Sequence, residues 1–103
     1  MATNKDYELV RFLLSGTDSG SIKWEPTAEP EQYTTSFKGK YTVTVNKGED
    51  EYWLSLNDEN DRQLLNTTND EDPNVGLLYH RALRASLNVD AAIDEIIGDD
   101  IPF

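Results

Sequence analysis

The chain has 103 residues, which is enough for one domain with an ordinary hydrophobic core. It contains no cysteine, which excludes disulfides, thiolate metal sites and cysteine nucleophiles. The net charge of −11 lies entirely in residues 48–103, and such an acidic surface repels nucleic acid phosphates, attracts basic proteins or simply keeps the protein in solution.

The beginning of the chain is polar, and it lacks the apolar core of a signal peptide. No apolar run approaches the length of a membrane span, so we expect a cytoplasmic protein that does not enter a membrane. The first predicted helix covers about residues 5–15, with Asn4 as its N-cap and Gly16 as its left-handed C-cap. Residues 22–25 are expected to form a short edge strand, because prolines follow them closely.

From Gln32 onward, apolar residues recur at every second position, which is the period of a β-strand. Gly39 and the Asn46-Lys47-Gly48 run mark hairpin turns between these strands. We therefore expect an antiparallel meander of four to five strands, since consecutive strands joined by short loops pair with each other. The apolar sets of the successive strands are Tyr33, Thr35 and Phe37; Tyr41, Val43 and Val45; and Tyr52, Leu54 and Leu56.

Two helices are predicted to cover one face of this sheet. Asp72-Pro73 is typical of a helix start, and that helix should continue to about Leu87. A second helix is expected over Val89–Ile97, with Gly98 ending it. The sequence thus predicts an α+β domain over residues 1–98, followed by an exposed acidic tip at residues 99–103. The expected inner faces are Val75, Leu78, Tyr79 and Ala82 on the first helix, and Val89, Ala92, Ile93 and Ile96 on the second.

The tip residues are Asp99, Asp100, Ile101, Pro102 and Phe103. This segment resembles the acidic C-terminal tail of bacterial single-stranded DNA-binding proteins, a resemblance limited to these five residues. It implies that the ring of Phe103 enters an apolar pocket of a replication, repair or recombination protein. It further implies that the α-carboxylate of Phe103 pairs with a basic side chain while the two aspartates contact a basic rim. In those proteins the tail follows a long flexible linker, whereas here only Gly98 separates it from a predicted helix.

Two other functions are consistent with the sequence. Residues 33–47 combine aromatic and lysine residues without any acid, a composition suited to stacking bases and following phosphates of single-stranded DNA. Alternatively, the carboxylates of residues 48–72 could imitate DNA phosphates in an inhibitor from a conflict between phage and host. The candidates are Tyr33, Phe37, Lys38, Lys40, Tyr41 and Lys47 for DNA binding, and Asp58, Glu59 and Asp61 for DNA mimicry.

Catalytic, cofactor and metal motifs are not predicted. His80 is the only histidine, and it has no serine or aspartate partner at a recognisable spacing, so a helix-surface or half-buried position is expected rather than a catalytic base. The run from Asp70 approaches a calcium loop, but its glycine falls one position late and Arg81 stands where the loop requires Glu. We therefore expect a non-enzymatic protein without a cofactor. The oligomeric state is not predicted.

Overall fold

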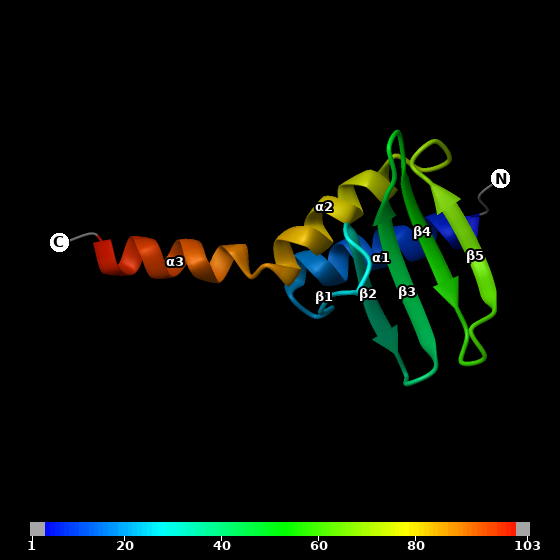
Figure 1. Cartoon of the computed structure of the whole chain (residues 1–103), viewed down its shortest axis with the longest axis horizontal. Coiled ribbons are helices and arrows are strands. Elements are labelled where there is room, and N and C mark those ends of the chain that lie inside the picture. Colours follow the sequence, from blue (N-terminus) through cyan, green and yellow to red (C-terminus); the bar gives the residue numbers. More distant parts are fainter. Residues whose placement is uncertain (1–3, 101–103) are drawn as a thin grey trace.

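Two helices cover one face of a five-stranded antiparallel sheet, and a third helix extends away from this body (Figure 1). The computed structural model describes residues 4–100, including the side chains of residues 4–88 and 91–98. Each strand pairs with its neighbour in sequence, which confirms the predicted α+β class and the antiparallel meander. The strands are β1 (Glu25–Pro26), β2 (Gln32–Phe37), β3 (Tyr41–Lys47), β4 (Tyr52–Asn57) and β5 (Gln63–Thr68).

Helix α1 (Asn4–Ser19) continues for about one turn beyond its predicted end. Gly16 lies inside the helix, and the side chain of Ile22 occupies the space that a β-carbon at Gly16 would need. The left-handed residue is Gly20, which has a φ of +83°. The predicted cap at Gly16 is therefore wrong, because this glycine permits close packing within the helix and does not form a turn.

The β2–β3 connection lies at the predicted Gly39, whereas the β3–β4 turn begins later than predicted, because Asn46 and Lys47 still belong to β3. Lys38 and Gly39 both have positive φ angles, of 56° and 68°, as a tight β2–β3 hairpin requires. The β3–β4 hairpin is closed by the backbone N–H of Gly48, which donates to the carbonyl of Glu51 at 2.7 Å. The edge strand lies later than predicted, at Glu25–Pro26, because most of residues 22–25 connects α1 to the sheet.

The core lies between the sheet and helices α1 and α2 (Asn74–Ser86). The two-residue period correctly identifies the covered face of the sheet, where Val43, Val45 and Leu54 are at most 1% exposed. The helical spacing is equally successful on α2. Its predicted inner residues Val75, Leu78, Tyr79 and Ala82 are all buried.

Asp72 prepares the start of α2. Its side chain is buried, and Oδ1 accepts a hydrogen bond from the backbone N–H of Asn74 at 3.0 Å. Its carbonyl accepts the N–H of Val75 at 2.9 Å, while Pro73 already has helical angles. The predicted pairing of Asp72 with Pro73 at a helix start is thus confirmed.

Trp24 connects α1 to the core. Its side chain is only 4% exposed, and its indole Nε1 donates to the hydroxyl of Thr17 at 2.8 Å. That hydroxyl in turn donates to the carbonyl of Leu13 at 2.7 Å. A large aromatic group and two consecutive buried hydrogen bonds therefore fix the last turn of α1 against the segment that leads to the sheet.

Helix α3 (Val89–Asp100) begins after Asn88, whose positive φ of 55° separates it from α2. Figure 1 shows α3 pointing away from the sheet, and every described side chain of this helix, residues 91–98, is exposed. The predicted burial of Ala92, Ile93 and Ile96 is therefore wrong for this structure, and the side chain of Val89, the fourth residue of that prediction, lies outside the described part of the chain. The helical period was recognised, but α1 and α2 already occupy the sheet face that α3 was expected to cover.

Candidate protein-docking surface

The predicted docking tip is connected to a projecting helix. Gly98 does not end α3, which continues through Asp99 and Asp100. A glycine within a helix costs only about 1 kcal/mol, which the neighbouring helical residues outweigh here. The predicted domain boundary at residue 98 thus falls inside α3. The remaining tip residues, Ile101, Pro102 and Phe103, lie outside the described residues.

Helix α3 has an apolar stripe exposed to solvent. Ile93, Ile96 and Ile97 are 40%, 59% and 50% exposed, and their spacing places them on one side of the helix. Asp94 flanks this stripe, and Glu95 lies on the opposite side of the helix. An isolated helix of about 12 residues is marginally stable in water, and a helix with five acids and no base lacks stabilising charge pairs. Such a helix is typical of one that is completed by a contact with another surface.

The aromatic residues proposed for DNA binding are directed mainly toward the helices. The rings of Tyr33 and Tyr79 are 5.7 Å apart, and those of Phe37 and Phe12 are 6.2 Å apart. Both strand residues are half-buried and pack against the core. Their faces are therefore engaged within the chain, and the structure gives the hypothesis of a single-stranded DNA-binding surface no stacking platform at these two positions.

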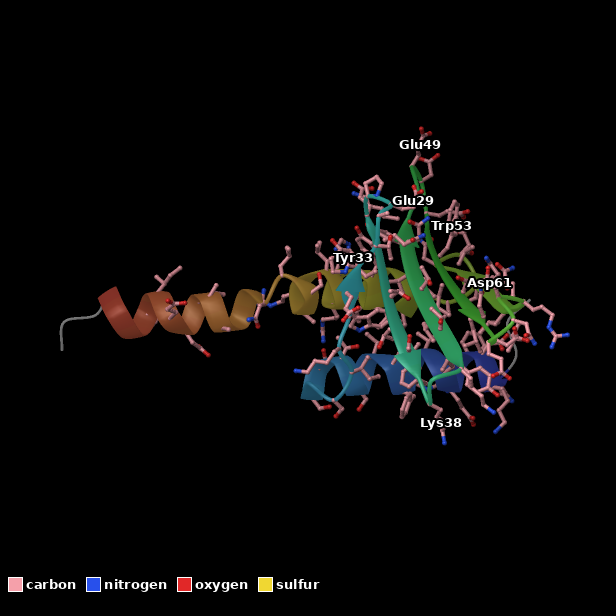
Figure 2. The ribbon with its side chains drawn as sticks, turned by 60° about the horizontal axis from the view of Figure 1, so that its bottom comes forward. Glu29, Tyr33, Lys38, Glu49, Trp53 and Asp61 are labelled. Carbon is pink, nitrogen blue, oxygen red and sulfur yellow. The ribbon has the colours of Figure 1, made fainter. Side chains whose placement is uncertain are left out.

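Four members of that set, Phe37, Lys38, Lys40 and Tyr41, lie at the β2–β3 hairpin, whereas Tyr33 and Lys47 lie toward the other end of these strands. Lys38 lies at the end of the β2–β3 hairpin (Figure 2), and Lys47 at the far end of β3. Lys40 sits over the ring of its neighbour Tyr41, with Nζ 5.2 Å from the ring centroid. Trp53 is the largest aromatic group on the uncovered face of the sheet, where it is 37% exposed. The predicted set therefore does not form one continuous surface.

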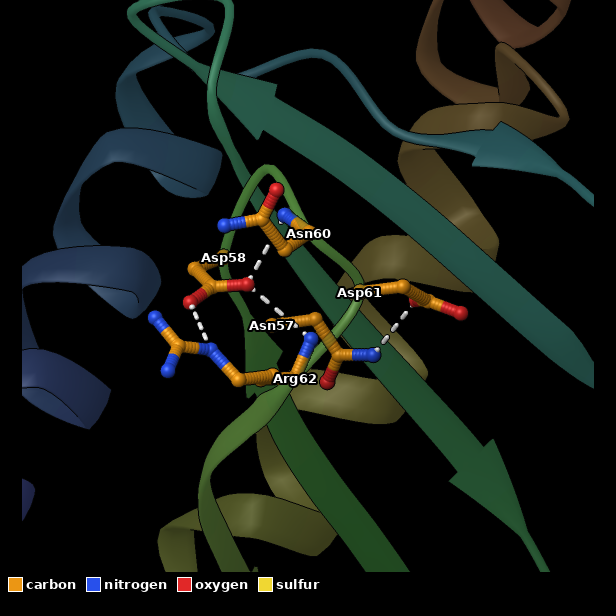
Figure 3. A network of polar contacts seen from close by, with 5 residues as sticks. All are labelled: Asn57, Asp58, Asn60, Asp61 and Arg62. Carbon is orange, nitrogen blue, oxygen red and sulfur yellow. Dashed lines mark hydrogen bonds and ion pairs between the residues drawn. The ribbon is translucent and has the colours of Figure 1, made fainter.

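The acids proposed to imitate phosphates lie in the β4–β5 turn, where two of them have internal partners (Figure 3). Oδ1 of Asp58 accepts the backbone N–H groups of Asn60 and Arg62 at 2.9 and 3.0 Å, and Oδ2 accepts Arg62 Nε at 2.9 Å. Asp61 accepts a hydrogen bond from the Asn57 amide at 3.0 Å, while Glu59 is exposed. Asp58 therefore organises the turn, and its charge is compensated locally.

The same contacts predict how the turn responds to pH. The hydrogen bond from the Arg62 backbone N–H is the largest cause that holds the pKa of Asp58 below its ordinary value, with the Asn60 N–H and the Arg62 side chain adding to it. A lowered pKa in the folded state gives stability that is present above the unfolded pKa of about 3.9 and is lost as pH falls through the folded pKa. We expect Asp58→Asn to remove the part of the acid-induced loss of folding stability that comes from protonation of Asp58. Chemical denaturation between neutral and strongly acidic pH would measure it, and parallel profiles for the two proteins would contradict it.

A second candidate surface lies at the end of α2, and it was not predicted from the sequence. His80, Arg81, Leu83, Arg84 and Leu87 line a shallow hollow of about 350 Å³. Leu87 is 64% exposed, and α2 contains no acidic residue in a chain that has twenty. The absence of acids from this helix is the sequence feature that could have indicated the surface. His80 is exposed as predicted, and its Nε2 is 3.1 Å from the hydroxyl of Tyr52.

Other features of the described residues do not define a reaction centre. Among the described side chains, those of residues 4–88 and 91–98, no group of three or more His, Cys, Asp or Glu is placed to hold a metal ion. In the same part of the chain, no helix combines the length and apolar character needed to cross a membrane. A comparison with protein-family models, with curated proteins and with solved structures finds no match to this chain. The functional assignment must therefore rest on the surfaces described above.

Proposed function

We propose that this chain is a non-enzymatic interaction module that docks on DNA replication, repair or recombination proteins through residues 99–103. The observation that carries the proposal is the position of α3. Asp99 and Asp100 lie at the end of this helix that is farthest from the sheet (Figure 1). In this position a partner reaches the tip without colliding with the folded body. In single-stranded DNA-binding proteins a long flexible linker separates the tail from the folded body. In this chain we propose that α3 provides that separation.

The partner has an apolar pocket bordered by lysine or arginine. The ring of Phe103 fills the pocket, and its α-carboxylate accepts charge-assisted hydrogen bonds from a basic side chain. Asp99 and Asp100 add long-range attraction, which makes association sensitive to salt. Fourteen acids in residues 48–103 provide a field of the same sign, so encounter with a basic partner is favoured over encounter with DNA.

Removing Phe103 is expected to weaken binding about ten- to hundred-fold, because burying an aromatic ring contributes about 1.5–3 kcal/mol. The probe is a purified bacterial exonuclease that binds the tail of single-stranded DNA-binding protein, and binding is measured by calorimetry. A peptide of that tail should compete with the intact chain. Adding one residue after Phe103 should weaken binding similarly, because it moves the carboxylate.

Phe12→Ala provides the matched control, since Phe12 is a 58% exposed phenylalanine on the folded body. This variant should bind like the original protein. The proposal is contradicted by unchanged binding without Phe103, by equal losses for the two phenylalanines, or by no binding of the intact chain to the exonuclease.

A further inference from the structure

Two exposed surfaces of this chain are complementary in both charge and apolar character. Helix α3 carries five acids and no base, and it exposes three isoleucines. The outer side of α2 carries Arg81 and Arg84, of which Arg81 also pairs with Asp18 of α1, and α2 itself contains no acid. Two of the three arginines in the acidic half of the chain therefore border a hollow that ends at the exposed Leu87.

The two surfaces do not meet within one molecule. Asn88 has a left-handed conformation, and α3 continues outward from the end of α2 without turning back along it (Figure 1). The described side chains of α3 are accordingly exposed, and so is Leu87 beside the hollow. The α3 helix of a second molecule has the freedom to approach this hollow that its own α3 lacks.

We propose that two copies of this chain form a reciprocal dimer, in which α3 of each copy packs on the α2 surface of the other. In this arrangement Ile93, Ile96 and Ile97 cover Leu83 and Leu87. Asp94, which flanks the isoleucine stripe, then lies near Arg81 and Arg84. Exchange of an identical element between two copies produces a closed dimer with two-fold symmetry, so each copy contributes one α3 helix and one α2 surface.

The reciprocal arrangement explains how α3 is stabilised. The helix is too short and too acidic to be stable alone. Contact with a surface that carries leucines and arginines buries its isoleucines and gives its acids partners of opposite charge. A stable interface usually buries about 800 Å² on each partner. Because the dimer has two identical contacts, each contact needs to bury only about half of this area. Direct pairing of α3 with α3 is disfavoured, because it brings ten acids together without a single base.

The first test is the mass in solution, measured by light scattering after size exclusion. The protein should have twice the monomer mass of 11.7 kDa and should dissociate on dilution. Ile96→Ser should raise the dissociation constant about hundred-fold, because one large apolar contact is lost in each half of the dimer. Leu64→Ser is the control, since Leu64 is 53% exposed on the body and lies outside the proposed interface.

The second test exchanges the charges between the two surfaces. One variant carries Arg81→Glu and Arg84→Glu, and the other carries Asp94→Arg, which reverses the acid that flanks the isoleucine stripe. Each variant alone opposes like charges and should be monomeric, whereas an equal mixture restores both contacts and should form a heterodimer. The exposed Arg81–Asp18 ion pair is also lost in the first variant, but a pair of this kind contributes little to folding. Tryptophan fluorescence verifies that each variant is folded.

Three results would overturn the dimer. These are a monomeric original protein, a dimer that Ile96→Ser leaves intact, and a dimer that persists after both arginines are reversed. The last result would assign the contact to a surface other than α2. The dimer does not depend on the proposed docking function, because all of its tests use the isolated protein and leave Phe103 unchanged.

Discussion

Trp24→Ala is expected to lower the free energy of unfolding by about 3–5 kcal/mol, the usual cost of removing a buried Trp or Phe side chain. A small domain has a total stability of about 5–15 kcal/mol, so this single change removes a large fraction of it. The loss has two sources. The indole leaves a cavity among α1 and the sheet residues, and the hydroxyl of Thr17 loses the donor that it accepts from at 2.8 Å. Urea denaturation followed by circular dichroism measures the difference.

Trp53→Ala is the matched control, because it removes the same side chain from the uncovered face of the sheet. Trp53 is 37% exposed, and its Nε1 donates to the exposed Glu51 carboxylate at 2.6 Å (Figure 2). We expect a much smaller loss there, since little of the core depends on it. Equal losses for the two tryptophans would show that the core does not distinguish the two faces of the sheet as the structure does.

The strands of the sheet and the start of α2 were predictable, because each depends on residues that are close together in the sequence. A two-residue period with turn residues between the runs suffices for β2, β3 and β4, whose buried members Val43, Val45 and Leu54 all occupy expected positions. The start of α2 was equally predictable from Asp72 and Pro73, because capping depends on adjacent residues.

Glycine was the main source of error, since its sequence context does not reveal why it is there. Gly16 admits the side chain of Ile22, Gly20 forms the turn, and Gly98 is an interior position of α3. Gly16 and Gly98 were both predicted to end a helix, and only the tertiary structure distinguishes close packing from a positive φ.

The candidate site was less predictable than the fold. The period of α3 correctly indicated an apolar stripe on Ile93 and Ile96, but periodicity does not specify which surface covers a stripe. The complementary surface on α2 required knowledge that His80, Arg81 and Leu87 line the same hollow. For the acidic turn, composition alone indicated free carboxylates, whereas two backbone N–H groups and the Arg62 side chain donate hydrogen bonds to Asp58.

A second large effect is expected from one substitution made at two buried threonines, with opposite outcomes. Thr67 in β5 is 1% exposed, and within the described residues its Oγ1 has no hydrogen-bond partner. Thr67→Val replaces this hydroxyl by a methyl group of similar shape and should raise the free energy of unfolding by about 1 kcal/mol, because an unsatisfied buried group is removed. Thr17→Val should lower it by about 1–3 kcal/mol, because the indole N–H of Trp24 then lacks its acceptor.

The comparison isolates hydrogen bonding from packing, since both sites exchange the same atoms in a buried, β-branched residue. Thermal and urea denaturation of the two variants give the sign directly. A loss of stability at Thr67 equal to that at Thr17 would mean that the Thr67 hydroxyl has a partner in solution. A gain at both sites would mean that the Trp24–Thr17 hydrogen bond does not offset the cost of burying the two polar groups. If the polar contacts at the end of α1 help to fix that helix to the sheet, the free energy of unfolding must rise in Thr67→Val and fall in Thr17→Val.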